Sequence, residues 1–206
     1  MKTIDYFAYL VENIHTTIIA TVDDAGHPVT SAIDMMDYDE SGLYFLTAKG
    51  KKFYQRLKAH PHIALTGLKG ESTMTSVALS LQGEVKEIGP DYLPRLFSKN
   101  PYMYEIYPNE TARETLTVFK IERGHGEWFD LSKRPIERDQ FTFGDDDMVE
   151  HGFFITNQCI GCGACVAVCP QLCIVDDQVP FQIEHRHCLR CGACLKECPV
   201  NAIKRK

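Results

Sequence analysis

The stretch that decides the fold of the C-terminal region is Cys159–Pro170, which reads Cys-Ile-Gly-Cys-Gly-Ala-Cys-Val-Ala-Val-Cys-Pro. The same spacing returns at Cys188–Pro199 as Cys-Leu-Arg-Cys-Gly-Ala-Cys-Leu-Lys-Glu-Cys-Pro. Both runs follow the pattern C-x2-C-x2-C-x3-C-P, so Cys159 corresponds to Cys188 and Pro170 to Pro199. An internal repeat of this kind predicts two half-domains of one small pseudo-symmetric fold.

The Cys pattern is typical of bacterial ferredoxins that hold two [4Fe-4S] clusters. Iron–sulfur clusters need soft thiolate ligands, and in this pattern the fourth Cys of each run serves the other cluster. The predicted ligands are Cys159, Cys162, Cys165 and Cys198 for what we name the first cluster, and Cys169, Cys188, Cys191 and Cys194 for the second cluster. Because each half supplies ligands to both clusters, we expect cluster binding to be coupled to folding.

Two other interpretations of the Cys residues explain less of the pattern. A disulfide framework is typical of small secreted domains, but no signal peptide is visible and the Cys lie in one part of the chain. Zinc ribbons use pairs of C-x2-C with longer separations, and would leave half of these Cys unexplained. The ninth thiol, Cys173, corresponds to Ala202 in the repeat, which favours a small buried core residue over a ligand or redox thiol.

Composition and charge exclude several classes of protein. The 206 residues are 44% hydrophobic and 24% charged, which is ordinary for a globular protein. The formal net charge of −6 leaves no basic nucleic-acid footprint. No apolar run is long enough to cross a bilayer and no targeting segment is visible, so we expect a cytoplasmic protein with neither a nucleic-acid nor a membrane partner.

Upstream of the Cys region, the hydrophobic pattern predicts an α+β fold, in which an antiparallel barrel is joined by a few short helices. The predicted helices lie at Asp5–Ile14, around Phe53 and Leu57 up to His60, and at Asp91–Ser98; the predicted strands are Thr16–Val22, Val29–Met36, Leu43–Thr47, Ile63–Thr66, Val77–Val85, Thr115–Glu122 and Glu127–Leu131. Residues 132–151 are polar and turn-rich. We therefore predict a barrel at 1–131, a linker at 132–151 and a ferredoxin-like α+β domain at 152–206.

A basic motif follows the third predicted strand. Thr47-Ala48-Lys49-Gly50-Lys51-Lys52 places three cations at the end of a strand and the start of a helix. Helix N-terminal amides and Lys side chains together make an anion site that suits a phosphate. The alternative is a solvated, lysine-rich helix start.

The order of elements around this motif resembles that of the pyridoxamine 5′-phosphate oxidase-like split-barrel flavoproteins. The resemblance spans residues 1–131 and rests on Leu43-Tyr44-Phe45-Leu46-Thr47, Lys51-Lys52-Phe53-Tyr54, Leu57-Lys58-Ala59-His60-Pro61 and Ile63-Ala64-Leu65. It implies a homodimer that binds FMN in a groove between subunits. The FMN-binding residues it implies are Lys49, Lys51 and Lys52 at the phosphate, Thr47 and Ala48 along the same edge, Ser31, Ala32 and Ile33 beside the isoalloxazine ring, and Trp128 near the flavin.

The resemblance also leaves alternatives open. Trp128 is equally consistent with a core residue, and members of the superfamily can bind haem or a deazaflavin instead of FMN. The chain shows no Arg/His set that would mark a pyridoxal-phosphate pocket, so a different substrate is expected.

Together the two regions predict an iron–sulfur flavoprotein oxidoreductase. Each [4Fe-4S] cluster passes one electron at a time, whereas a flavin accepts electrons singly and delivers them in pairs. No G-x-G-x-x-G fingerprint supports nicotinamide binding. We expect electrons to pass from a low-potential redox protein through both clusters to FMN and on to a small oxidised acceptor; no catalytic residue is identified. The alternatives are a non-catalytic electron carrier or redox sensor, and a haem- or deazaflavin-binding barrel.

Overall fold

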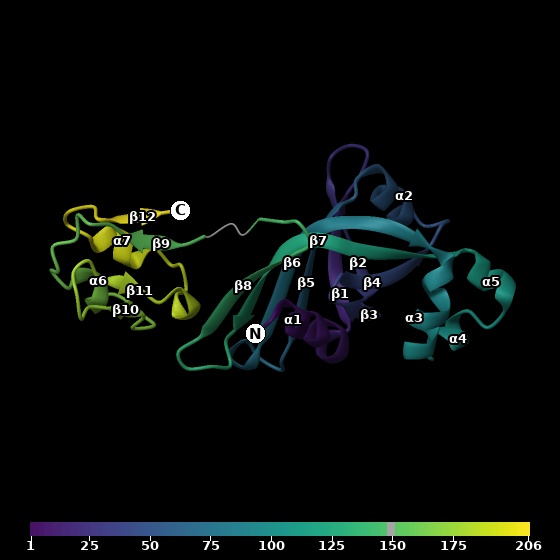
Figure 1. Cartoon of the computed structure of the whole chain (residues 1–206), viewed down its shortest axis with the longest axis horizontal. Coiled ribbons are helices and arrows are strands. Elements are labelled where there is room, and N and C mark those ends of the chain that lie inside the picture. The colour runs from purple at the N-terminus through teal and green to yellow at the C-terminus, as the bar shows by residue number, and fades with distance from the viewer. Residues whose placement is uncertain (148–150) are drawn as a thin grey trace. The chain divides into compact units, whose positions relative to one another are not determined.

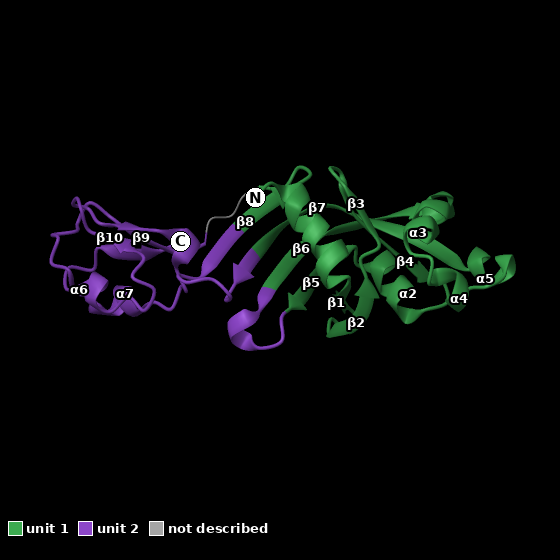
Figure 2. Ribbon diagram, turned by 90° about the horizontal axis from the view of Figure 1, so that it is seen from below, with its two compact units in different colours: residues 1–69, 78–127, 140–147 green, residues 70–77, 128–139, 148–206 purple. Residues whose placement is uncertain are grey.

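The computed structural model describes residues 1–147 and 151–206, and these form two compact units (Figures 1 and 2). The first unit comprises residues 1–69, 78–127 and 140–147. The second contains the Cys region together with segments 70–77 and 128–139. No helix among the described residues is long and apolar enough to span a membrane.

A single eight-stranded sheet dominates the N-terminal region. Its strands run in the order β2-β1-β5-β6-β7-β4-β3, and β8 pairs with β7. Their bounds are β1 (Thr16–Val22), β2 (Pro28–Asp34), β3 (Asp37–Asp39), β4 (Gly42–Ala48), β5 (His62–Lys69), β6 (Val77–Gly89), β7 (Leu116–Asp130) and β8 (Glu137–Phe143). The pairs β1–β2, β1–β5, β3–β4 and β4–β7 are antiparallel. The predicted α+β class is confirmed.

Short helices join these strands, as the hydrophobic pattern predicts. They are α1 (Thr3–Tyr9) with a π-helical continuation η1 (Leu10–Ile14), α2 (Lys52–Ala59), η2 (Thr73–Thr75), η3 (Pro90–Tyr92), α3 (Leu93–Lys99), α4 (Met103–Ile106) and α5 (Glu110–Glu114). α2 buries Phe53 and Leu57, which lie one turn apart on the same face of the helix. The first residue of α2, Lys52, is exposed and its side chain is available for a site.

The sequence predicts two strands where the structure has one, β7. The predicted break at Arg123–Gly126 contains two glycines, which usually interrupt a strand. Here they allow close packing instead: a Cβ on Gly124 would lie 2.2 Å from the carbonyl oxygen of Gln82, and a Cβ on Gly126 would lie 2.4 Å from the ring of Phe141. The glycines therefore let neighbouring chain segments approach β7 without ending it.

The segment predicted as a linker, 132–151, is partly structured. It contains β8, whose Phe141 and Phe143 are buried. Phe141 stacks on Tyr6 with ring centroids 4.5 Å apart, and Phe143 meets Phe7 edge to face. The prediction was wrong for residues 137–143 because the four polar residues that precede these aromatic rings, Glu137 to Gln140, resemble a loop in composition. Residues 148–150 of the predicted linker lie outside the described residues.

The Cys region folds as a pseudo-symmetric pair of half-domains. Its elements are β9 (Phe153–Ile155), α6 (Ala164–Ala167), β10 (Ile174–Val175), β11 (Gln182–Ile183), η4 (His185–His187), α7 (Ala193–Glu197) and β12 (Ile203–Arg205). β9 precedes the first Cys run and pairs with β12, which follows the second; β10 follows the first run and pairs with β11, which precedes the second. Each helix begins after a glycine in the left-handed conformation, Gly163 or Gly192. Each half is thus completed by a strand from the other.

Candidate cluster sites and flavin site

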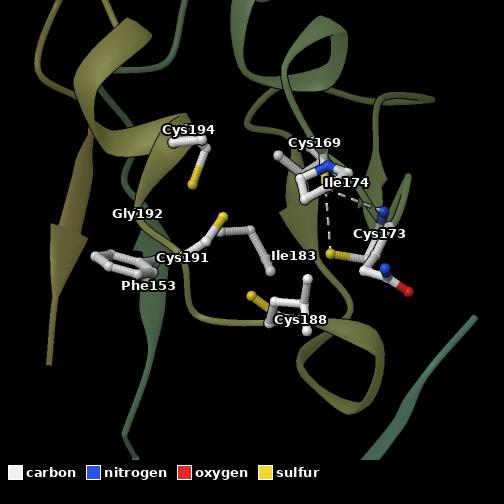
Figure 3. A pocket seen from close by; sticks show the side chains of 13 residues that line it. Phe153, Cys169, Cys173, Ile174, Ile183, Cys188, Cys191, Gly192 and Cys194 are labelled. Atoms are coloured by element: carbon white, nitrogen blue, oxygen red, sulfur yellow. Dashed lines mark hydrogen bonds between the residues drawn. The ribbon is translucent and has the colours of Figure 1, made fainter. Parts of the chain in front are cut away.

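Two hollows of similar size lie in the Cys region, with volumes of about 340 and 300 Å³. One is lined by the four Cys predicted for the second cluster, Cys169, Cys188, Cys191 and Cys194 (Figure 3). The other is lined by the four predicted for the first cluster, Cys159, Cys162, Cys165 and Cys198. The structure therefore brings together, in each hollow, three thiols of one run and the last thiol of the other. Four soft donors in an otherwise apolar lining fit a [4Fe-4S] cluster.

Backbone amides point at several of these sulfur atoms. The N–H of Arg190 donates to Cys188 Sγ at 3.3 Å, that of Cys173 to Cys169 Sγ at 3.4 Å, and that of Ala202 to Cys198 Sγ at 3.2 Å. Such hydrogen bonds favour the thiolate form and tune the potential of a bound cluster. A hydrogen bond from Cys173, reinforced by the Arg190 amide, lowers the pKa of the Cys188 thiol to about 6.

Cys173 is buried, as predicted, but its contacts with the predicted ligands of the second cluster are not predicted from the sequence. Its Sγ lies 3.5 Å from Cys169 Sγ and it lines the same hollow as the second-cluster ligands (Figure 3). The hydrogen bond to Cys188, followed by burial, raises the pKa of the Cys173 thiol above its ordinary value. The only signal in the sequence was the mismatch with Ala202 at the equivalent position of the repeat.

The turn between β7 and β8 contacts the half-domain of the second cluster. The N–H of Ile136 donates to the Gln171 side-chain oxygen at 3.1 Å, and His187 Nδ1 hydrogen-bonds to the Ile136 carbonyl at 2.8 Å. Gln171 lies two residues after Cys169, and His187 directly precedes Cys188. Both contacts therefore lie beside ligands predicted for the second cluster.

The three lysines predicted at the FMN phosphate gather at the start of α2. Lys51 is its N-cap residue, Lys52 is its first residue, and Lys49 lies just before them, after the end of β4 at Ala48. All three side chains are exposed. The first amides of a helix lack partners within it, so this arrangement fits an anion.

Thr47 supplies a second observation that fits a bound ligand. Its side chain is only 2% exposed, and among the described residues its Oγ1 has no hydrogen-bond partner. A buried hydroxyl without a partner is unfavourable in a folded protein unless another group satisfies it. A polar ligand atom at the end of β4 would provide that group.

Arg56 connects this region to Ser31 on β2. Its Nε donates to Thr21 Oγ1 at 2.7 Å and its Nη2 to Ser31 Oγ at 3.3 Å. Sequence reasoning missed Arg56, although it lies one turn after Lys52 on the same helix and so shares its face. The structure thus brings Ser31 next to the helix that begins with the predicted phosphate residues.

The position of α2 depends on a half-buried anchor, Glu87 of β6. Glu87 accepts hydrogen bonds from Lys58 Nζ at 2.9 Å and Tyr54 Oη at 3.3 Å on α2, and from Thr117 Oγ1 at 2.8 Å on β7. Burial alone raises the pKa of Glu87, but these hydrogen bonds outweigh it, so the pKa lies below its ordinary value. A lowered carboxyl pKa stabilises the fold near neutral pH, and this contribution is lost as the solution is acidified.

The remaining predicted flavin residues are placed less uniformly. Ser31 and Ile33 are half-buried, whereas Ala32 between them is exposed on the opposite face of β2, because successive side chains of a strand alternate. Side chains from only one face of β2 can therefore contact the isoalloxazine ring of a bound flavin. Trp128, on β7, is 7% exposed and belongs to the second compact unit. Its role at the flavin stays a prediction.

The crossed ligand sets predict which pairs of Cys substitutions damage one cluster and which damage both. Cys159→Ala with Cys198→Ala alters only the first hollow, so we expect the second cluster, about four irons per chain, to remain. Cys159→Ala with Cys169→Ala alters both hollows although both residues lie in the first run, so we expect iron to fall well below that. Anaerobic iron and sulfide analysis measures this. A lower iron content in Cys159→Ala/Cys198→Ala than in Cys159→Ala/Cys169→Ala would contradict the crossed assignment of ligands.

Comparison with known proteins agrees with both regions. The family model "Pyridoxamine 5'-phosphate oxidase" matches residues 5–126, and the model "4Fe-4S dicluster domain" matches residues 157–203. A search of curated proteins found no match.

Solved structures show the same barrel fold. A NimC/NimA family protein from Clostridium acetobutylicum has a TM-score of 0.57 at 14% identity, covering 69% of this chain and 95% of that one. A protein related to general stress protein 26, of the pyridoxinephosphate oxidase family and also from Clostridium acetobutylicum, has 0.50 at 19%, covering 66% and 90%. A heme binding protein from Mycobacterium smegmatis has 0.52 at 13%, covering 69% and 59%.

These identities are low and show the fold alone, whereas the first family model covers more than half of the chain. The matched residues include the basic motif at the start of α2, and the second model includes all eight predicted cluster ligands. The chain therefore belongs to the pyridoxamine 5′-phosphate oxidase family and continues into a C-terminal ferredoxin domain for two [4Fe-4S] clusters.

Proposed function

We propose that this protein is an iron–sulfur flavoprotein reductase. Electrons from an external low-potential redox protein pass through the two [4Fe-4S] clusters to FMN and on to a small oxidised acceptor. The observation that supports this most directly is that each of two hollows is lined by four thiols, in the same chain as a barrel with a basic helix start. Candidate cluster sites and a candidate phosphate site on one polypeptide suit electron transfer within the molecule.

FMN fits the groups around α2 better than a ligand without a phosphate. Three exposed lysines and the first amides of α2 suit a phosphate, and the unsatisfied Thr47 hydroxyl lies at the adjoining end of β4. Arg56 holds Ser31 against the same helix. FMN would supply the conversion of single electrons into pairs. The protein would bind and orient it through these side chains.

We also propose that the barrel forms a homodimer through the outer face of its sheet. Directly opposed residues share a face of a sheet, and the registers Ile18↔Ala32, Ile18↔Thr66, Ala20↔Thr30 and Ala20↔Ala64 define one uncharged surface. Ser80 of β6 extends it through a 3.0 Å hydrogen bond to Thr66. Ile18 is 50% exposed and Leu68, two residues after Thr66, is 63% exposed. An apolar, uncharged patch of this kind suits a second copy of the chain.

Removal of the lysine charges tests both the cofactor and the function. In Lys51→Ala/Lys52→Ala we expect FMN affinity to fall by about 10- to 100-fold, from two lost charge-assisted hydrogen bonds. Iron content and cluster reduction should be unchanged, and reduction of a panel of enones, nitro compounds and quinones should be lost. Anaerobic flavin and iron counts and acceptor turnover measure this. Lys86→Ala, an exposed lysine on β6 away from α2, is the matched control.

Three results of that experiment would contradict the proposal. A Soret band in the purified wild-type protein would show that the bound cofactor is haem and not FMN. Extraction of a deazaflavin would show that the cofactor is a deazaflavin. Wild-type turnover no faster than that of free FMN would favour the alternative electron carrier or redox sensor, which uses the same groups without an acceptor of its own.

A charge on the uncharged sheet face tests the homodimer. Ile18→Lys places an ammonium group in the centre of this sheet face. We therefore expect light scattering to give a monomer for the variant and a dimer for the wild type. FMN retention should also be reduced, because Ala32 of the predicted flavin strand lies directly opposite Ile18. Ile106→Lys, on α4 and 59% exposed in the wild type, is the control and should remain dimeric. A monomeric wild type, or a dimeric Ile18→Lys, would refute the interface.

A further inference from the structure

We propose that the Cys173 thiol donates a hydrogen bond to the iron-bound thiolates of the second cluster and raises the reduction potential of that cluster above that of the first. This inference deepens the proposed function, because it gives the electron relay a direction. It rests on the geometry of the hollow shown in Figure 3, where Cys173 lies next to Cys169 and lines the same hollow as Cys188.

The position of Cys173 is set by its backbone as well as its side chain. Its N–H donates to Cys169 Sγ at 3.4 Å, its own Sγ lies 3.5 Å from that sulfur, and the residue is 2% exposed. Cys188 lines the same hollow. A buried thiol beside the Cys169 sulfur has no water with which to exchange this interaction.

The direction of the hydrogen bond follows from the cluster chemistry. When iron is bound, Cys169 and Cys188 are thiolates and have no proton to give. Cys173 is then the one thiol of the three that can donate. It is not needed as a ligand, because Cys169, Cys188, Cys191 and Cys194 already supply the four thiolates of a cubane.

The first cluster lacks this donor. The residue equivalent to Cys173 is Ala202, whose N–H donates to Cys198 Sγ at 3.2 Å in the same way. The backbone hydrogen bond is therefore present in both halves, whereas the side-chain hydrogen bond is present only in the half of the second cluster, because a methyl group cannot donate.

The physical consequence is a difference in potential. Reduction adds an electron to the cluster and increases the negative charge on its sulfurs, so a hydrogen-bond donor stabilises the reduced form more than the oxidised form. The second cluster should thus accept the electron in preference to the first. It is also the cluster whose neighbours, Gln171 and His187, contact the turn after β7. The hydrogen bond favours electron flow from the first cluster to the second.

The test is a redox titration of the complete protein, with dithionite as reductant and EPR detection of each reduced cluster. In Cys173→Ala we expect the midpoint potential of one cluster to become more negative while the other is unchanged and the full iron content is retained. Cys173→Ser keeps a donor and should shift it less. The converse substitution, Ala202→Cys, introduces a donor at the first cluster and should make its potential more positive.

Two outcomes would overturn the inference. Unchanged potentials in Cys173→Ala would show that the thiol does not act on the cluster, and loss of iron in that variant would make Cys173 a ligand. Neither depends on flavin or on an acceptor, so failure here leaves the acceptor turnover experiment standing. Conversely, a protein without acceptor turnover would still show the shift in Cys173→Ala.

Discussion

The crossing of thiol ligands between the two Cys runs is the constraint on which the ferredoxin domain depends. Each hollow takes three thiols from one run and the last thiol from the other. The strands follow the same rule, because β9 pairs with β12 and β10 with β11. Neither half can then be complete without the other. This exchange brings both candidate cluster sites into one small fold.

The flavin site depends instead on the placement of a single helix, α2. Its buried face is fixed by Phe53 and Leu57, its outer side by Glu87, and its connection to β2 by Arg56. These contacts hold the start of α2 against the sheet, and its lysines are exposed there, where they can bind an anion. In the proposed homodimer, the uncharged sheet face that contains the exposed Ala32 would bring the partner subunit close to the same strand.

The candidate cluster sites could be predicted from the sequence because chemistry restricts the spacing of their residues. The four-thiol requirement of a cubane predicts the ligand sets, and the structure brings each set together. Elements predicted from composition agree less well with the structure. The glycines of β7 predict a break because glycine usually weakens a strand, yet Gly124 and Gly126 allow the close approach of neighbouring segments of the chain. The polar residues of β8 favour a loop, so the burial of Phe141 and Phe143 is not predicted. Their burial depends on aromatic rings of α1, which lies far away in the sequence.

Contacts made only by the fold could not be predicted. Arg56 and Glu87 are ordinary charged residues in the sequence, and their roles follow from partners on other strands. Cys173 is predicted to be buried, but its contact with Cys169 follows from the turn after the ligand. The helix of Arg56 and the burial of Cys173 agree with the prediction, whereas Glu87 lies beyond the predicted end of its strand at Val85. The missing information was the identity of a neighbour distant in sequence or brought close by a turn.

The central claim is that electrons reach the flavin through the clusters. It is tested most directly by anaerobic stopped-flow mixing of the oxidised protein with reduced methyl viologen, with cluster bleaching and flavin absorbance followed separately. The account predicts that the clusters bleach first and that the flavin follows at a rate independent of viologen concentration, as an intramolecular step must. A flavin reduced as fast in Cys191→Ala, at a rate proportional to viologen concentration, would contradict it.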